Sequence, residues 1–227
     1  MRLLVTGGAG YIGSHFAALA AGLGHEVIVY DNFSSGHKWA CKDREIVVGD
    51  ILNFDSILSA LQGIDAVCHF ASKIVVSESV ADPAAYYRAN VHGTDTLLRA
   101  MTKAGCSRLI FSSTAAVYGQ PADDQGLLDE ASPANPLNPY GISKLKAEKL
   151  IHQWTRDFRG CATVFRYFNA AGCVPELCLG ELHEPETHLI PNVIESLLDP
   201  VSRAFLLYGN DYKTPDGSCV RDYIHVA

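Results

Sequence analysis

Two residues near the middle of the chain, Tyr140 and Lys144, have the types and the spacing for proton transfer. They lie four residues apart in the segment Asn-Pro-Tyr-Gly-Ile-Ser-Lys, and a helix would place both on one face. A lysine ammonium beside a tyrosine hydroxyl favours the ionised form of that tyrosine. The pair therefore predicts a phenolate base that takes the proton of an alcohol during its oxidation.

A glycine-rich segment at residues 7–13, GGAGYIG, predicts that a dinucleotide accompanies this oxidation. Glycines let the backbone turn tightly and approach a pyrophosphate, which the amides at a helix N-terminus then hold. Asp31 follows about twenty residues later, where its carboxylate can accept hydrogen bonds from the adenosine ribose. That carboxylate would repel a 2′-phosphate, which favours NAD, while nearby Lys38 and Arg44 leave NADP open.

The elements that must position these residues alternate between short apolar runs and longer amphipathic segments. The runs predict strands buried on both faces at residues 3–6, 26–30, 46–49, 66–70, 109–112 and 163–167. Helical periodicity is found at residues 11–23, 55–61, 83–104 and 140–158. This alternation predicts an α/β fold with a doubly wound parallel sheet of the Rossmann type. After about residue 170, prolines interrupt short segments around a helix near 189–198, which predicts the beginning of a smaller substrate-binding lobe.

Residues that follow the predicted strands are expected to line the cofactor crevice, because strand carboxyl ends face it in such sheets. Asp50 and Ile51 follow the third strand and are expected to flank adenine. Residues 70–72, Phe-Ala-Ser, follow the fourth and are expected on the nicotinamide side. His69 is expected to be a packed strand-end histidine without a catalytic role.

Composition limits the class of protein. With 227 residues, 48% of them hydrophobic and 19% charged, the chain can bury a sizeable core. A net charge of -7 disfavours a nucleic-acid partner. The seven cysteines form no C-x-x-C pair, so we expect reduced thiols in the cytoplasm rather than disulfides, and no metal site. The start of the chain does not resemble a signal peptide, and no long apolar stretch predicts a membrane span.

Segments spread from end to end of the chain resemble one known family. They include VTGGAGYIGSH at 5–15, FSSTAAVYG at 111–119, NPYGISK at 138–144, HEPETHLIP at 183–191 and YGNDYKTPDGSCVRDYIHVA at 208–227. With these segments the chain resembles the extended short-chain dehydrogenase/reductases, the NAD-dependent epimerase family, and within it the UDP-glucose 4-epimerases. The resemblance implies an NAD-binding Rossmann domain at residues 1–170 and a partial nucleotide-sugar-binding region at 171–227.

The resemblance also implies roles for individual residues. Thr114 would hydrogen-bond the reacting oxygen, Tyr140 would act as acid and base, and Lys144 would bind the nicotinamide ribose and lower the pKa of the tyrosine. The implied cofactor contacts are Gly7, Gly10, Tyr11, Ile12, Gly13, Asp31, Asn32, Asp50, Ile51, Phe70, Ala71, Ser72, Lys73, Asn90, Tyr140, Lys144 and Phe168. The implied substrate contacts are Thr114, Asn169, Leu189, Tyr208 and Arg221, whose guanidinium suits a pyrophosphate.

The activity implied by the resemblance is that of an isomerase. It would interconvert UDP-galactose and UDP-glucose through a 4-keto sugar, with hydride passing transiently to tightly bound NAD. The UDP-sugar would be the small-molecule partner. The resemblance further implies a homodimer formed through the helices predicted at 83–104 and 140–158.

Several alternatives stay open at this point. Sugar-nucleotide 4,6-dehydratases carry an Asp-Glu pair where this chain has Ala115 and Ala116, so dehydration is disfavoured. A 4-epimerase of another UDP-sugar, such as UDP-arabinose, UDP-xylose or UDP-N-acetylglucosamine, is a further possibility. The family normally continues beyond the position of Ala227, so a truncated chain that binds NAD without turnover is also considered. Ala89 stands where epimerases often have asparagine, which predicts the loss of one hydrogen bond on the nicotinamide side.

Overall fold

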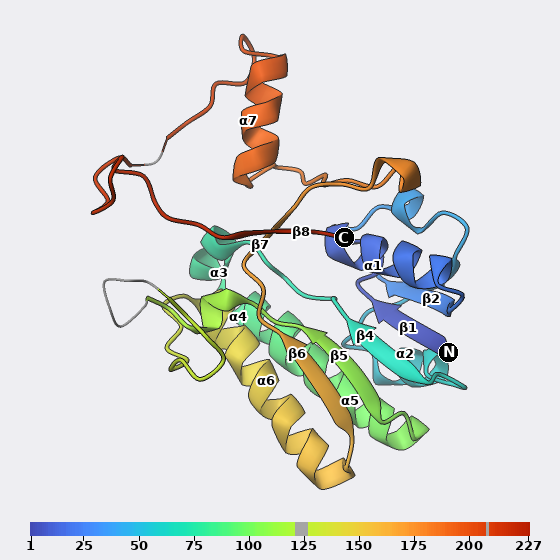
Figure 1. Ribbon diagram of the computed structural model, residues 1–227. Helices are drawn as coiled ribbons and strands as arrows, with labels where there is room; N and C mark the ends of the chain where they lie inside the picture. Colours follow the sequence, from blue (N-terminus) through green and yellow to red (C-terminus); the bar gives the residue numbers. More distant parts are fainter. Residues whose placement is uncertain (121–126, 208) are drawn as a thin grey trace. The chain divides into compact units, whose positions relative to one another are not determined.

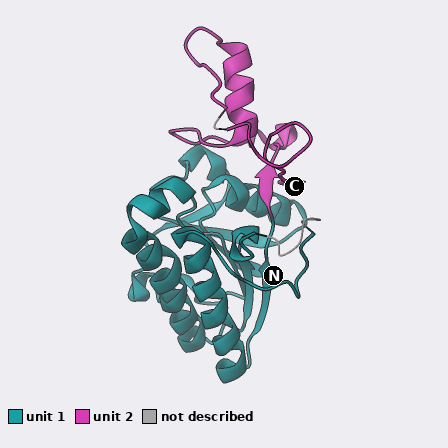
Figure 2. Cartoon of the chain, turned by 90° about the vertical axis from the view of Figure 1, so that its left-hand side faces the viewer, with its two compact units in different colours: residues 1–167 teal, residues 168–227 magenta. Residues whose placement is uncertain are grey.

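The computed structural model describes residues 1–120, 127–207 and 209–227. The chain folds into two compact units, Met1–Tyr167 and Phe168–Ala227 (Figure 2). The division lies just before residue 170, where the sequence predicts the end of the first domain.

The first unit contains a six-stranded, wholly parallel sheet with the strand order β3-β2-β1-β4-β5-β6 (Figure 1). Its strands are β1 (Arg2–Thr6), β2 (Glu26–Asp31), β3 (Glu45–Val48), β4 (Ala66–His69), β5 (Arg108–Ser112) and β6 (Cys161–Phe165). This is the strand order of a dinucleotide-binding sheet, in which the order reverses between β1 and β4. Both the predicted fold class and the parallel sheet are confirmed.

Helices cover both faces of this sheet. The longer ones are α1 (Tyr11–Gly22), α2 (Phe54–Ala60), α5 (Gly93–Ala104) and α6 (Pro139–Phe158). Apolar side chains of α2, α5 and α6 form one core with the sheet, whereas α1 contributes to a second core with β1, β2 and β4. Shorter helical segments are η1 (Lys38–Cys41), α3 (Val76–Ala81), α4 (Pro83–Tyr86), η2 (Tyr87–His92) and η3 (Ala115–Val117).

Some expected boundaries and burial patterns are wrong. The last strand of the sheet lies at Cys161–Phe165 rather than 163–167. Most residues of β3 and β6 are exposed, because these strands form the two edges of the sheet and were wrongly expected to be buried on both faces. The helix predicted at 83–104 is interrupted by one π-helical segment, η2, between α4 and α5.

The second unit is smaller and contains a two-stranded parallel sheet, β7 (Asn169–Ala171) and β8 (Tyr223–His225). Between these strands the chain forms a short helical turn, η4 (Pro175–Leu177), and the helix α7 (Leu189–Leu198). The helix agrees with the one predicted near residues 189–198.

The cysteines of both units are free thiols. Cys41, Cys68 and Cys106 are buried in the first unit, where burial raises the thiol pKa of Cys41 to about 11 and that of Cys68 to about 12. In the part of the chain that the structure describes, no helix has the length and apolar character to cross a membrane.

Candidate active site

The glycine-rich segment forms the turn between β1 and α1, and two of its glycines have no room for a side chain. Gly7 has a φ of +71°, and a Cβ added there would lie 2.4 Å from the backbone nitrogen of Ala71. A Cβ added at Gly13 would lie 2.2 Å from the carbonyl oxygen of Gly7. Gly10 is the N-cap of α1 and offers no capping side chain, and the first turn has no acidic residue. The positive end of α1 is therefore suited to an anionic group such as a pyrophosphate.

The carboxylate of Asp31 lies beside this turn, at the end of β2. One carboxylate oxygen accepts a hydrogen bond from the backbone of Ala9 at 3.0 Å, and the other accepts from the backbone of Phe33 at 2.8 Å. Asp31 is only 8% exposed. Each oxygen keeps a second lone pair, so the carboxylate is fixed in place and can still accept a hydroxyl.

Residues after β2 and β3 lie next to one another, as the parallel sheet requires. The Asn32 side chain donates to the Asp50 carboxylate at 3.3 Å, and the other oxygen of Asp50 accepts from the backbone of Leu52 at 2.8 Å. Ile51 packs against the start of α5, where a Cβ added at Gly93 would lie 2.7 Å from the Ile51 side chain. These contacts bring the predicted adenine-side residues together at one edge of the sheet.

The loop after β4 approaches the glycine turn. Gly7 faces the backbone of Phe70 and Ala71, and the Phe70 ring packs against Phe16 of α1 with the ring centroids 5.3 Å apart. The Ser72 hydroxyl turns back to the carbonyl of Phe70 at 3.5 Å. The predicted nicotinamide-side segment is thus held against the start of the dinucleotide turn.

Asn90, predicted to contact the cofactor, joins this loop to α6. Its Oδ1 accepts from the Lys73 backbone at 2.8 Å, and its Nδ2 donates to the Lys73 carbonyl at 3.0 Å and to Ser143 Oγ at 2.9 Å. Both Nδ2 hydrogens are used, and Asn90 is 2% exposed. Asn90 lies in the π-helical segment η2, a geometry that is frequent at functional sites. Direct contact between Asn90 and NAD stays a prediction.

Thr114 and Tyr140 each lie at the start of a helix, Thr114 at η3 and Tyr140 at α6. Thr114 is the N-cap of η3 and accepts from the backbone of Ala116 at 3.1 Å. Asn138 caps α6 by accepting from Gly141 at 2.8 Å, which places Tyr140 in the first helical turn. The Thr114 hydroxyl acts to lower the pKa of Tyr140, but burial raises it more strongly, to about 12. The lowering of this pKa by Lys144 stays a prediction.

Lys144 lies one helical turn after Tyr140 and is 2% exposed. Its ammonium sits over the Phe111 ring, 4.8 Å from the centroid. Burial lowers the pKa of Lys144 to about 7, against the opposing effect of the Glu148 carboxylate. The side chain therefore changes charge near neutral pH.

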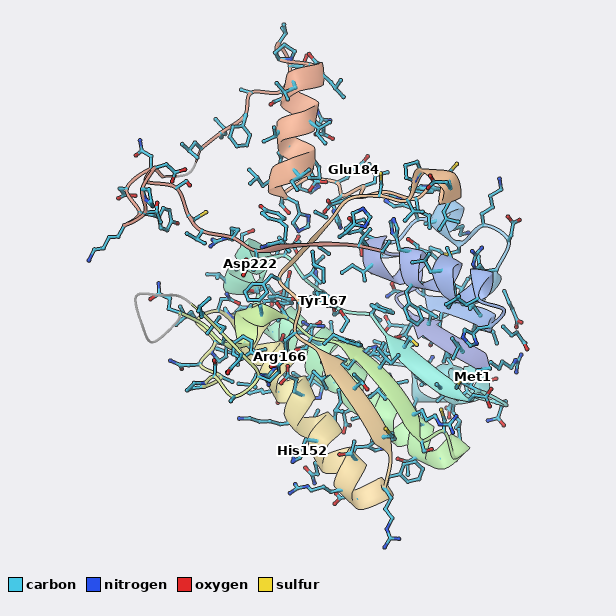
Figure 3. All side chains as sticks on the ribbon, viewed as in Figure 1. Met1, His152, Arg166, Tyr167, Glu184 and Asp222 are labelled. Carbon is cyan, nitrogen blue, oxygen red and sulfur yellow. The ribbon has the colours of Figure 1, made fainter. Side chains whose placement is uncertain are left out.

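Glu148 continues the same face of α6 and was not predicted from the sequence. Its carboxylate accepts hydrogen bonds from Arg166 at 3.0 Å and from the Ser113 hydroxyl, and Arg166 follows β6 (Figure 3). Glu148 is 9% exposed, so this pairing neutralises a buried charge. Its position could have been noticed from the sequence, because Tyr140, Lys144 and Glu148 are each four residues apart and so lie on one face of a helix.

His69 and the serines beside Thr114 have structural contacts. The His69 ring hydrogen-bonds Thr6 at 2.7 Å and Thr94 at 3.1 Å, and burial lowers its pKa to about 3. This agrees with the expectation of a packed histidine. The Ser112 hydroxyl is hydrogen-bonded to the hydroxyl of Tyr167, and the Ser113 hydroxyl donates to the Glu148 carboxylate. Both serines therefore fix the end of β5, just before Thr114.

A pH-dependent stability is expected from Lys144. Its pKa is lower in the folded chain than the ordinary value of 10.5, so between those two values the unfolded chain binds more protons and stability rises with pH. We expect Lys144→Met to remove on the order of 2 kcal/mol of the increase in unfolding free energy between pH 7 and 9. Urea unfolding at several pH values measures this. Lys149 lies at an exposed position of α6, so the matched change Lys149→Met should not alter the increase in unfolding free energy with pH. If Lys144→Met also left this increase unaltered, the lowered pKa of Lys144 would be contradicted.

The remaining predicted contacts belong to the second unit. Asn169 starts β7, and its side chain donates to the carbonyl of Asp222 at 2.8 Å. Leu189 is the first residue of α7, and it and Phe168 are 49% and 42% exposed. Arg221 is exposed and directly precedes Asp222, so it lies near Asn169 within this unit. Tyr208 lies outside the described residues.

Comparisons with known proteins give one consistent result. The model of the NAD dependent epimerase/dehydratase family matches residues 3–227. The chain is 47% identical over 230 aligned residues to a UDP-glucose 4-epimerase of Halalkalibacterium halodurans, and the alignment covers 100% of this chain and 67% of the relative. A crystal structure of UDP-glucose 4-epimerase from Brucella ovis in complex with NAD superposes with a TM-score of 0.94 at 44% identity, covering 99% of this chain and 69% of that one.

A more distant structural neighbour is a dTDP-glucose 4,6-dehydratase from Streptomyces venezuelae, solved with NAD and a further ligand. Its TM-score is 0.84 at 32% identity, with 100% of this chain and 68% of that chain covered. The fold is therefore similar to that of enzymes with both chemistries.

Proposed function

The chain belongs to the NAD dependent epimerase/dehydratase family, and from this premise we propose that it is an NAD-dependent UDP-sugar 4-epimerase that interconverts UDP-galactose and UDP-glucose. The observation that carries the proposal is the placement of Thr114 at the start of η3 and Tyr140 in the first turn of α6, where Thr114 acts on the pKa of Tyr140, with buried Lys144 one turn further along α6. That arrangement offers a proton acceptor and a hydroxyl that orients the reacting oxygen. The high identity along the whole chain to UDP-glucose 4-epimerases supports the choice of sugar.

The residues of the first unit fit NAD. The glycine turn excludes side chains at Gly7 and Gly13 and presents the uncapped N-terminus of α1, where the pyrophosphate would be held. Asp31 would accept from the adenosine ribose, Asn32, Asp50 and Ile51 would flank adenine, and the loop at residues 70–73 would lie on the nicotinamide side. When bound, NAD would supply the hydride acceptor for oxidation of the sugar alcohol, and its reduced form would supply the hydride for reduction of the 4-keto sugar.

The chain's own residues then move the proton. Tyr140 takes the proton of the sugar 4-hydroxyl and returns it to the 4-keto oxygen when the inverted alcohol forms. Thr114 donates a hydrogen bond to the reacting oxygen and keeps it next to the tyrosine. Burial holds the pKa of Tyr140 at about 12, so formation of the phenolate would depend on the positive charge of protonated Lys144 and of the bound cofactor.

The local structure after Thr114 supports epimerisation over dehydration. The next two residues are Ala115 and Ala116, which lie in η3 and have no group that can donate or accept a proton. Elimination of water from the sugar needs such a group. We therefore expect the chain to return the 4-keto sugar as an alcohol and to release no deoxy sugar.

We also propose contacts, an assembly and a compartment for this enzyme. Asn169, Leu189, Tyr208 and Arg221 would bind the UDP-sugar, with the Arg221 guanidinium on the pyrophosphate. A homodimer would form through α5 and α6, both of which have exposed residues opposite their buried sides. Free thiols throughout the chain suit the reducing cytoplasm.

The test is conversion of UDP-galactose by the purified chain with added NAD, with UDP-glucose detected by a coupled dehydrogenase. We expect UDP-glucose to form. We also expect the kcat/KM for UDP-galactose to be higher than the kcat/KM for UDP-arabinose, UDP-xylose or UDP-N-acetylglucosamine. Preference for one of those sugars would replace the proposed substrate. A folded chain that binds NAD but converts none of them would show that it lacks turnover.

A further inference from the structure

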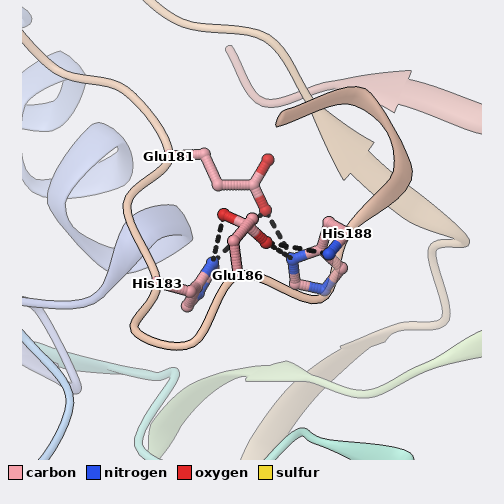
Figure 4. A group of neighbouring side chains, drawn as sticks. All are labelled: Glu181, His183, Glu186 and His188. Atoms are coloured by element: carbon pink, nitrogen blue, oxygen red, sulfur yellow. Dashed lines mark hydrogen bonds and ion pairs between the residues drawn. The ribbon is translucent and has the colours of Figure 1, made fainter. Parts of the chain in front are cut away.

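Four side chains in the segment before α7 converge on one point in the second unit. They are Glu181, His183, Glu186 and His188, and the ligand atoms of all four lie within 4.8 Å of one another (Figure 4). The sequence spacing is Glu-x-His-x-x-Glu-x-His, so one short segment supplies them all. The expectation of no metal site rested on the cysteines, whereas this group consists of imidazoles and carboxylates.

Three of the four distances between histidine nitrogens and carboxylate oxygens are close to those around a tetrahedral metal ion, and the fourth is shorter. His183 Nδ1 lies 3.4 Å from Glu181 Oε1 and 3.7 Å from Glu186 Oε2, while His188 Nδ1 lies 2.6 Å from Glu181 Oε1 and 3.4 Å from Glu186 Oε1. A zinc ion with bonds of about 2.0 to 2.1 Å holds its ligand atoms about 3.3 Å apart. Small side-chain adjustments would therefore complete such a shell.

The burial of the two carboxylates points to a positive charge between them. The side chains of Glu181 and Glu186 are only 7% and 5% exposed. One oxygen of Glu186 accepts from the backbone of Thr187 at 2.7 Å and of His188 at 2.8 Å. Buried Glu181 Oε1, by contrast, accepts no hydrogen bond from any residue that the structure describes.

The short contact to Glu181 has an informative geometry. His188 Nδ1 lies 2.6 Å from Glu181 Oε1, yet the pair does not meet the geometry of a hydrogen bond. The two atoms form an ion pair when the imidazole is protonated, and when it is neutral both can direct lone pairs at a shared cation. A buried carboxylate oxygen without a donor is costly unless a cation compensates it.

We propose that Glu181, His183, Glu186 and His188 bind a divalent transition metal ion, with Zn²⁺ as the best fit. Two imidazole nitrogens favour Zn²⁺ over the oxygen-bound Ca²⁺ and Mg²⁺. Four protein ligands leave no open position, which is typical of a structural site rather than a catalytic one. His188 directly precedes Leu189, so the ion would fix the segment that leads into α7. The site is independent of the proposed epimerase activity.

The experiment measures Zn²⁺ binding to the full chain by competition with a chromophoric chelator, without substrate or NAD. We expect Glu181→Gln and His188→Gln each to weaken Zn²⁺ binding at least about 100-fold, because each removes a direct ligand. Glu184→Gln, in the same segment but outside the cluster, and His152→Gln, on the exposed side of α6, are the matched controls and should bind as the unchanged chain does.

X-ray absorption at the zinc edge tests the same site without any substitution. We expect nitrogen and oxygen neighbours at about 2.0 Å with the outer-shell signal of two imidazoles. Sulfur neighbours at about 2.3 Å would place the ion on cysteines and overturn the proposal. So would the absence of Zn²⁺ binding at micromolar concentration, or equal affinity in folded Glu181→Gln. None of these outcomes depends on whether the chain is an active epimerase.

Discussion

Replacing Tyr140 with phenylalanine is expected to lower kcat about 1,000-fold and to affect NAD affinity far less, because only one of the proposed cofactor contacts is removed. The substitution removes only the hydroxyl, whose oxygen is the proposed proton acceptor and whose pKa is influenced by Thr114. Loss of a general acid and base costs about 10² to 10⁴ in rate. The ring, which packs edge-on against Tyr86 at a centroid distance of 6.4 Å, is retained, so the folded structure should be preserved.

The measurement is the rate of UDP-glucose formation from UDP-galactose at saturating substrate, with NAD affinity determined by calorimetry on the same samples. Tyr87→Phe is the matched control, because Tyr87 is 38% exposed in the neighbouring π-helical segment and has no proposed role in proton transfer. We expect it to retain full activity. A Tyr140→Phe chain that keeps more than about a tenth of kcat would contradict the role assigned to this hydroxyl.

The second large effect is expected from Gly13→Ala. The added methyl group would lie 2.2 Å from the carbonyl oxygen of Gly7 and 2.9 Å from the Cα of Gly8, and both are backbone atoms that cannot rotate away. The turn must therefore shift, with a loss of about 2 to 4 kcal/mol in unfolding free energy. Because the same turn is the proposed pyrophosphate site, NAD affinity should fall at least about tenfold.

Gly22→Ala is the control for this prediction. Gly22 is the last residue of α1, the helix that Gly13 helps to begin, and a Cβ added there would have no neighbour within 4 Å among the described residues. Alanine is more favourable than glycine in a helix by up to about 1 kcal/mol. We expect Gly22→Ala to be neutral or stabilising and to bind NAD normally, as urea unfolding and calorimetry would show. Equal behaviour of the two variants would mean that the turn tolerates a side chain at residue 13.

The sequence was sufficient to predict the sheet and much of the arrangement around it. Buried parallel strands require long apolar runs, and the runs at β1, β2 and β4 stand out from the amphipathic segments between them. The glycine turn could be predicted because it needs a specific residue type at Gly7 and Gly13. Exposed edge strands carry no such signal, since β3 and β6 have apolar runs similar to those of the central strands.

The charge states of the site could not be predicted from spacing alone. Tyr140 and Lys144 lie on one helix as expected, but their pKa values depend on burial, which the spacing does not reveal. The charge of Glu148, on α6, is neutralised by an ion pair with Arg166, which follows β6, and this pairing cannot be read from the spacing along α6. Similarly, Asn90 joins the loop after β4 to α6 through Ser143, and this contact spans elements whose register depends on the whole fold.

The most direct test of the proposed function follows the hydrogen on C4 of the sugar. UDP-galactose carrying deuterium at C4 is incubated in ordinary water with the chain and NAD, and the UDP-glucose formed is examined by mass spectrometry and NMR. If Tyr140 moves only the hydroxyl proton and the C4 hydrogen leaves and returns within one site, UDP-glucose should keep the deuterium at C4. Product in which solvent hydrogen has replaced the deuterium would contradict the account.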